Sequence, residues 1–209
     1  VPRICFINKM DKTGADFQRA IDSIAHRLHA RPVAIQIPVG KEGSFRGVID
    51  LVEGVALIHP DGSTEPPLEG PVPEELIEEF RVYRDQMIEK IAETDDVLIV
   101  KYLEGREITK PEIKAALRRA TADLRLVPVT CGSALRNAGI HALLDAVGDY
   151  LPSPKDVPPA KGTGFGNGHV VTREPTEEAP FAALAFKAIA DPFIGRLVYF
   201  RVYSGKIKG

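Results

Sequence analysis

The chain has 209 residues, with 27 Lys and Arg, 29 Asp and Glu, and a formal net charge of −2. An apolar share of 44% and a charged share of 27% are typical of a globular protein, and the small net charge favours neither bulk nucleic-acid binding nor a membrane surface. The two cysteines each lie in an apolar run, which argues against a disulfide framework and favours a reducing cytoplasm. The sequence shows no apolar run of membrane-spanning length and no visible signal peptide.

The first predicted element is a buried strand that runs directly into an Asn-Lys-x-Asp sequence. Residues 4–7 are continuously apolar, as expected for a parallel strand covered on both faces. Because Val1 stands directly before this strand, we expect the chain to begin inside a domain. Nucleotide sites in open α/β sheets lie just beyond the carboxyl ends of such strands, where Asn8, Lys9 and Asp11 follow.

These three side chains suit the recognition of guanine. The Asp11 carboxylate only accepts hydrogen bonds, and its two oxygens can take both the ring N–H and the exocyclic amine of guanine. Adenine offers no such donor pair. The Asn8 amide can serve the far edge of the purine, while the stem of Lys9 can lie across its face. Four residues are a weak signal by themselves, so this interpretation depends on a partner motif.

A helix is predicted next, with Asp16 as its N-cap. Apolar residues between Phe17 and Leu28 recur at helical spacing, and the helix must end before Pro32.

From residue 33 the apolar period changes from helix to strand. Alternation over residues 33–39 and the short apolar runs at 47–52 and 55–58 predict a small antiparallel meander of three strands. Residues 61–73 are rich in Pro, Gly and charge, which predicts a surface loop.

A long helix follows, with Pro73 near its first turn and one apolar stripe. Residues 61–96 carry twelve acidic side chains against three basic ones, and six of the acidic residues, between Glu74 and Glu89, lie on the helix face opposite the apolar stripe. Two interpretations stay open: a solvated helix face, or a docking surface for a basic protein partner. A shorter helix over residues 96–103 and a third helix that starts at a Thr109 capping box complete this region.

The second chemically informative stretch is the strand at residues 126–131, which ends in small residues before another helix. Small side chains just after a strand let backbone N–H groups approach a ligand closely. Between this stretch and the first motif lie residues 12–132, far more than one crossover helix needs. The intervening strands and helices are therefore predicted to be an insertion into a parallel-sheet crossover.

Asn-Lys-x-Asp at residues 8–11, followed by Ser133-Ala134-Leu135, resembles the two base-recognition motifs of the translational GTPases. With the insertion between them, the chain strongly resembles the elongation factor G family over nearly its whole length. Other stretches that carry the resemblance are residues 36–40, 45–51, 101–103, 129–134 and 151–154.

The resemblance implies which residues bind the nucleotide. The backbone N–H of Ala134 would meet the guanine carbonyl oxygen, and Ser133 would brace Asp11. The implied GTP-binding residues are Asn8, Lys9, Asp11, Ser133, Ala134 and Leu135. No Gly-x-x-x-x-Gly-Lys-Ser/Thr occurs in the chain, so we predict no catalytic or metal-binding residue here, and we expect magnesium in the parent protein to be held by residues that this chain lacks.

The implied fold is α/β: the C-terminal part of a P-loop-type GTPase parallel sheet, an inserted α+β subdomain and the first strands of a β-barrel. The expected segments are 1–32 and 124–157 for the GTPase domain, 33–123 for the insertion, 158–179 for a linker and 180–209 for the start of the barrel.

The implied function is that of the ribosomal translocase, a cytoplasmic GTPase that binds GTP or GDP and moves tRNA and mRNA on the ribosome. Its acidic helix would contact the flexible stalk protein of the large subunit through Glu74, Glu78 and Glu79. The parent would be an enzyme, whereas this chain alone is expected to be inactive, and no membrane is implied. Two alternatives stay open: a related ribosomal GTPase (a release factor or a tetracycline-resistance ribosome-protection protein), or a non-hydrolytic protein-interaction module.

Overall fold

The computed structural model of the protein describes residues 1–60, 65–164, 168–191 and 195–208. These form two compact units, Val1–Leu151 and Pro152–Gly209. The fold is mixed α/β, with one parallel and several antiparallel sheets, as predicted in outline. Within the described ranges, no helix has both the length and the apolar character needed to cross a membrane.

A three-stranded parallel sheet lies at the centre of the first unit. Its order is β1 (Cys5–Ile7), β7 (Val127–Cys131), β2 (Pro32–Ala34). Cys5 pairs with Val129 and Ile7 with Cys131, so β1 and β7 end at the same edge. The prediction that the two motif-bearing strands are neighbours in one parallel sheet is therefore confirmed, although residues 8–126 lie between β1 and β7 in the chain.

A second, antiparallel sheet has the order β3 (Gln36–Val39), β4 (Gly47–Asp50), β5 (Val55–Ile58), β6 (Leu68–Gly70). It corrects two predictions. The single strand expected over residues 33–39 is divided at Ile35 between the two sheets, because β2 pairs with β7 while β3 pairs with β4. Ile35 itself links them: its N–H donates to the Val129 carbonyl, and its carbonyl accepts from Leu51 N–H, each at 3.0 Å.

The fourth strand is the other correction. β6 lies within residues 61–73, which were predicted to be a loop, and it pairs with β5. Residues 61–64 of that predicted loop lie outside the described residues. The predicted start of the insertion, residue 33, falls within β2. The apolar alternation continues from β2 into β3, so it does not mark the point where the chain passes from one sheet to the other.

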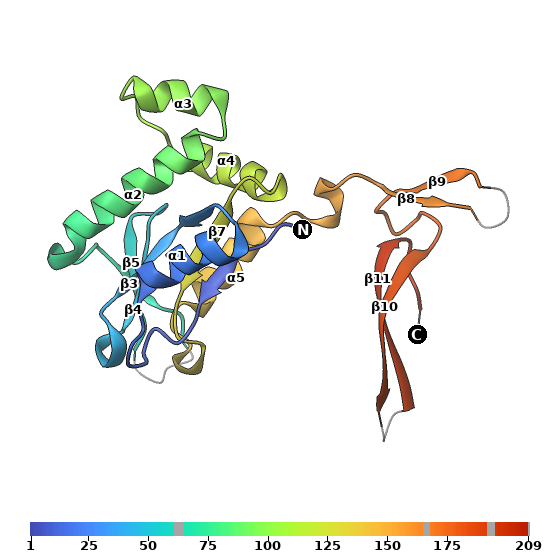
Figure 1. Cartoon of the computed structure of the whole chain (residues 1–209), viewed down its shortest axis with the longest axis horizontal. Helices are drawn as coiled ribbons and strands as arrows, with labels where there is room; N and C mark the ends of the chain where they lie inside the picture. Colours follow the sequence, from blue (N-terminus) through green and yellow to red (C-terminus); the bar gives the residue numbers. More distant parts are fainter. Residues whose placement is uncertain (61–64, 165–167, 192–194, 209) are drawn as a thin grey trace. The chain divides into compact units, whose positions relative to one another are not determined.

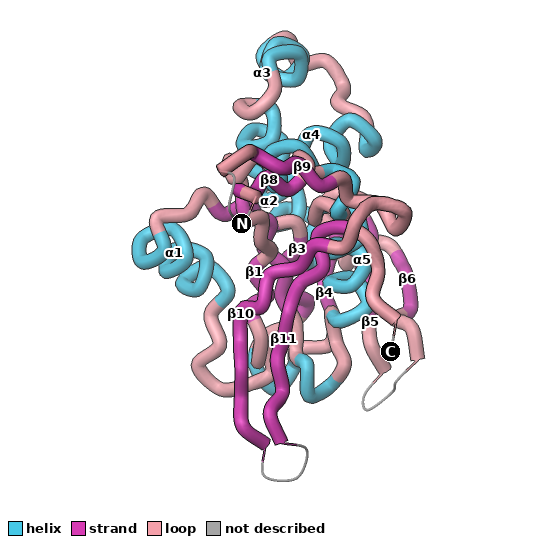
Figure 2. Tube along the Cα trace, turned by 90° about the vertical axis from the view of Figure 1, so that its right-hand side faces the viewer, coloured by secondary structure: helices cyan, strands magenta, loops and turns pink. Residues whose placement is uncertain are grey.

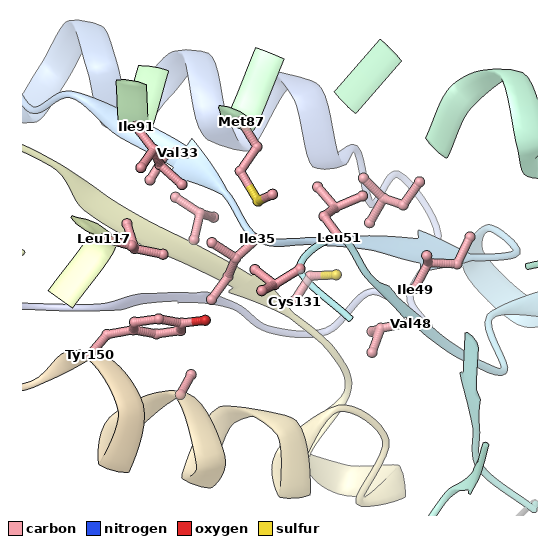
Figure 3. Packing of buried hydrophobic residues seen from close by; sticks show 14 of the residues in the cluster. Val33, Ile35, Val48, Ile49, Leu51, Met87, Ile91, Leu117, Cys131 and Tyr150 are labelled. Atoms are coloured by element: carbon pink, nitrogen blue, oxygen red, sulfur yellow. The ribbon is translucent and has the colours of Figure 1, made fainter. Parts of the chain in front are cut away.

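Helices cover both sheets of the first unit (Figure 1). They are α1 (Phe17–Leu28), α2 (Ile77–Ala92), α4 (Lys110–Ala122) and α5 (Ile140–Tyr150), whereas α3 (Asp96–Leu103) packs against α2. Figure 3 places Met87 and Ile91 of α2 on one side of the parallel strands and Tyr150 of α5 on the other. One hydrophobic cluster therefore extends through the predicted GTPase segments and the predicted insertion.

The helix starts follow the predicted capping chemistry. The Asp16 carboxylate accepts from Arg19 N–H at 2.9 Å, and Thr109 forms a reciprocal capping box with Glu112. The short helix predicted over residues 96–103 matches α3, whose N-cap Asp95 accepts from the N–H groups of Val97 and Leu98.

The second unit consists of two antiparallel hairpins (Figure 2). Strand β8 (Ala160–Thr163) pairs with β9 (Val170–Arg173), and β10 (Ala182–Asp191) pairs with β11 (Gly195–Ser204). The linker predicted over residues 158–179 thus contains a hairpin, in which the consecutive β-branched residues Val170, Val171 and Thr172 of β9 favour a strand. The two strands predicted near residues 181–187 and 197–203 are present as β10 and β11.

Candidate functional site

The candidate site lies at the carboxyl ends of β1 and β7, where two loops are joined by backbone hydrogen bonds. Gly132 N–H donates to the Ile7 carbonyl and Met10 N–H donates to the Gly132 carbonyl, each at 3.0 Å. Met10 is buried, and its side chain belongs to the hydrophobic core. The Asn-Lys-x-Asp loop is therefore fixed to both the second loop and the core.

Asn8 connects the two predicted motifs directly. Its Oδ1 accepts from Lys9 N–H at 2.8 Å and from Ala134 N–H at 2.9 Å, across 126 positions of sequence. The Ala134 N–H that the resemblance assigns to a ligand oxygen is thus paired with Asn8 in this structure. The two motifs thus lie side by side, and this bond, which was not predicted, joins the second loop to the first.

Asp11 is the buried charge of the site, with a side chain only 2% exposed. Its Oδ2 lies 3.1 Å from Lys12 Nζ and 3.7 Å from Arg136 Nε. Its Oδ1 is buried and has no hydrogen-bond partner among the described residues. A buried carboxylate oxygen without a donor is costly, so this atom is free to receive a donor from a ligand.

The pKa of Asp11 is lowered, first by the adjacent Ser133 hydroxyl and then by Lys12, while burial opposes them. Ser133 therefore lies beside Asp11, as expected. Its Oγ is nevertheless buried without a well-aligned hydrogen bond in the described part of the chain. The carboxyl is thus ionised at neutral pH and retains unused accepting capacity.

A closed turn presents the second motif. Ser133 N–H donates to the Ala138 carbonyl at 2.9 Å, and Ala138 N–H returns a bond to the Ser133 carbonyl at 3.1 Å. Gly139 follows with φ of 82°, and a Cβ there would lie 2.4 Å from the Cys131 carbonyl oxygen. Only glycine fits this position, because a side chain would collide with fixed backbone.

The two remaining predicted residues are oriented toward solvent. Lys9 is exposed and has φ of 65°, a conformation that non-glycine residues seldom adopt. Leu135 is 84% exposed, so its side chain takes no part in the core. Both side chains can contact a ligand laid across the loops, while the backbone N–H of Lys9 helps to hold the first loop through its bond to Asn8 Oδ1.

Sequence reasoning missed the contacts made by the antiparallel sheet. Gly14 N–H donates to Glu42 Oε1 at 2.7 Å, and Gly139 N–H donates to His59 Nε2 at 3.1 Å. Accepting this bond requires neutral His59, whose pKa is lowered by burial and then by His141. No local pattern identifies Glu42 or His59, since each meets its partner only through the folded sheet.

The predicted partner-binding residues lie elsewhere in the first unit. Glu74 is in a 3-10 turn (Glu74–Leu76), and Glu78 and Glu79 are in the first turn of α2. All three are exposed, and Glu78 forms a surface ion pair with Arg81 at 2.7 Å.

A charged cleft of about 290 Å³ separates β3–β5 from α4 and α5. Five carboxylates and two lysines line it, and Lys114 Nζ lies 2.8 Å from Glu53 Oε1 and 3.2 Å from Asp149 Oδ2. Lys110 Nζ donates to the Glu53 carbonyl at 2.7 Å. This network ties the β4–β5 turn to both helices, and we assign it a structural role.

Comparisons with known proteins agree with the motifs. A family model described as the elongation factor Tu GTP binding domain matches residues 1–153. Elongation factor G from Thermotoga neapolitana and that from Thermotoga maritima are each 53% identical over 210 residues, covering all of this chain and 30% of theirs. A crystal structure of a protein from Thermus thermophilus is 31% identical with a TM-score of 0.76, over 100% of this chain and 28% of that one. The chain thus spans about 30% of the length of the curated relatives it matches.

Proposed function

The chain belongs to the family of the elongation factor Tu GTP-binding domain, and from this premise we propose that it provides guanine recognition in a ribosomal translocase. The predicted resemblance to elongation factor G is confirmed by relatives that match over the whole chain. Because the chain spans about 30% of their length, activity, substrate and partners are proposed for the whole protein that carries it.

One observation carries the proposal. Asp11 is a buried carboxylate at the edge where two neighbouring parallel strands end, and one of its oxygens has no hydrogen-bond partner among the residues that the structure describes. Ligands of open α/β sheets bind at that edge. A ligand with two adjacent N–H donors satisfies both carboxylate oxygens, and guanine has such a pair whereas adenine does not.

The other residues take the roles that the motifs imply. The Asn8 amide serves the far edge of the purine, Lys9 covers one face of the ring, and Ser133 braces Asp11. Ala134 N–H meets the guanine carbonyl oxygen, so its 2.9 Å bond to Asn8 must be shared or released when the nucleotide binds. Leu135 contributes through its backbone, since its side chain is exposed.

In the whole protein this base recognition serves a GTPase cycle. GTP binding and hydrolysis drive movement of tRNA and mRNA on the ribosome, in the cytoplasm. Magnesium accompanies the nucleotide phosphates and supplies charge neutralisation there. No residue of this chain is proposed to take part in a catalytic step.

The architecture is proposed to follow the same plan. The antiparallel sheet together with α2, α3 and α4 forms an insertion in the crossover between β2 and β7. Strands β10 and β11 begin a β-barrel. Large side chains on both of these strands support this proposal, since Leu184 is 59%, Phe186 65% and Phe200 43% exposed and need a covering layer.

We propose that the acidic start of α2 contacts the ribosomal stalk protein. Glu74, Glu78 and Glu79 are exposed and lie within one helical turn or the 3-10 turn before it. Like charges gathered on a surface attract a basic partner over a distance set by ionic strength.

The proposed function is tested by Asp11→Asn in the whole protein. An Asn amide offers one donor in place of an acceptor, so it matches the C2 oxygen of xanthine rather than the amine of guanine. We expect GDP affinity to fall about 100-fold, as for loss of hydrogen bonds to a charged group, with a gain for xanthosine diphosphate. Displacement of a fluorescent nucleotide measures both.

Asp22→Asn is the matched control, since Asp22 is exposed on α1 and accepts from Gln18. It should retain the wild-type preference for GDP. Wild-type GDP affinity in Asp11→Asn, without any gain for xanthosine diphosphate, would overturn the assignment of Asp11.

A further inference from the structure

Arg136 makes two contacts that join Asp11 to the antiparallel sheet. Its Nε lies 3.7 Å from Asp11 Oδ2, and its Nη1 donates to the Phe45 carbonyl at 3.5 Å. One guanidinium therefore spans from the buried carboxylate to a backbone carbonyl 91 positions away in sequence.

Both ends of this link are anchored. Phe45 is buried in the core, and its N–H donates to the Glu42 carbonyl at 3.0 Å. The backbone of Arg136 belongs to the closed turn, where its N–H donates to the Ser133 carbonyl at 3.1 Å. The Arg136 side chain is therefore held at both ends, by its own backbone in the closed turn and by the Phe45 carbonyl. The planar guanidinium limits its orientation further.

Lys12 contacts the same carboxylate oxygen but has a different character. It is next to Asp11 in sequence, its side chain is 55% exposed, and its contact with Asp11 is 3.1 Å. Arg136 is 36% exposed and farther from Asp11. Lys12 helps to keep the pKa of Asp11 low, together with Ser133. Arg136 differs from Lys12 in that it also contacts the Phe45 carbonyl, which ties it to a second segment of the chain.

We propose that Arg136 is a positioning residue for nucleotide specificity, which orients the Asp11 carboxyl so that both oxygens face the two donors of guanine. This inference rests on the proposed function of the site. Arg136 touches neither the base nor the phosphates and acts through Asp11. The turn at Glu42–Phe45 holds the Arg136 side chain in place.

The proposal predicts a particular loss of specificity. A carboxyl free to rotate can still turn one oxygen toward a single N–H donor, but it loses the alignment needed for two donors at once. Hypoxanthine has the ring N–H of guanine without the exocyclic amine. Loss of Arg136 should therefore weaken GDP binding more than inosine diphosphate binding.

The experiment compares GDP and inosine diphosphate affinities in the whole protein by displacement of a fluorescent nucleotide. Arg136→Ala should lower the GDP preference about fivefold, as for loss of one ordinary hydrogen bond. Arg136→Lys should restore part of it, because a lysine can still contact Asp11 but lacks the planar fork. Arg31→Ala is the control: Arg31 forms an exposed ion pair with Glu93 at 2.7 Å, and the preference should stay at the wild-type value.

The outcomes distinguish the positioning role of Arg136 from the guanine-binding role of Asp11. An equal loss of affinity for both nucleotides in Arg136→Ala would mean general damage to the loop and would overturn the positioning role. An unchanged preference would overturn it as well. If the wild-type protein does not distinguish GDP from inosine diphosphate, the proposed function of Asp11 fails, and this inference fails with it.

Discussion

The base-recognition loops and the acidic start of α2 use the same chemical group in opposite surroundings. The Asp11 side chain is 2% exposed and is held between Lys12, Arg136 and the Ser133 turn. The Glu78 side chain is 83% exposed and has one neighbouring partner on its own helix. One carboxylate is buried among charged and polar neighbours, whereas the other remains in water.

We expect this difference to give the two regions different kinds of function. A buried carboxylate interacts strongly over a short distance and discriminates by hydrogen-bond direction. Exposed carboxylates are screened within about 8 Å at physiological ionic strength, so they act together and mainly on rates of association. Specificity is therefore expected from the loops and recruitment from the helix.

The largest expected effect comes from disturbing the rigidity of the loops. In Gly139→Ala, the added Cβ would lie 2.4 Å from the Cys131 carbonyl oxygen at a φ of 82°. We expect a loss of about 3 kcal/mol in the free energy of unfolding, measured by urea denaturation of the chain.

Gly148→Ala provides the matched control on the helix that follows this turn. A Cβ at Gly148 meets no atom within 4 Å, so this variant should gain about 0.5–1 kcal/mol from helix propensity. Similar free energies of unfolding for Gly139→Ala and Gly148→Ala would show that the loop adjusts easily to the added Cβ. The contrast between rigid loops and the exposed start of α2 would then be lost.

A smaller effect is expected from reversing charge at the exposed region. Changing Glu74, Glu78 and Glu79 together to Lys in the whole protein should lower ribosome-stimulated GTP turnover about tenfold at low salt, with less effect at high salt. GDP affinity should not change, because these residues are not part of the loops. Stopped-flow turnover at several ionic strengths measures the effect.

The control reverses the charge of Glu174, Glu177 and Glu178, three carboxylates of the second unit. Equal losses in the two triple variants would indicate a general effect of net charge. No loss in either would leave the start of α2 as a solvated helix face.

The smallest effect concerns a carboxylate of intermediate exposure. Lys101, followed by the Thr109 backbone N–H and hydroxyl, lowers the pKa of Glu112 from 4.5 to about 2. Because the folded pKa is depressed, Glu112 stabilises the fold above pH 4.5, and this contribution is lost as pH falls toward 2.

Glu112→Gln should therefore lower the melting temperature of the chain at pH 7, and the difference from wild type should shrink as pH falls from 4.5 toward 2. Glu78→Gln, on the exposed face of α2, should change the melting temperature little, both at pH 7 and below pH 4.5. Equal effects of the two substitutions at pH 7 would mean that exposure does not distinguish them.

Most of the elements could be predicted because their signals are local. The N-cap at Asp16, the capping box at Thr109 and helix α3 each depend on residues within one turn. The division of residues 33–39 between two sheets could not be predicted. Apolar alternation reports that a strand is buried but does not identify the strand beside it.

The site divides in the same way. The motifs predicted that Ser133 would brace Asp11, and the structure places them side by side; the bond from Ala134 N–H to Asn8 was not predicted. Arg136 directly follows the second motif but had no predicted role. Its link to Phe45 depends on a register that no local pattern contains.

Residue types and short spacings were enough to predict the chemistry of the candidate site: which side chains could recognise guanine, and that two strands carry them. Only the folded chain shows that one oxygen of Asp11 is buried without a partner among the described residues, and that the antiparallel sheet supports the turn facing it. Burial and distant contacts arise when segments far apart in the chain pack into one core, and only then does a carboxylate acquire a fixed direction.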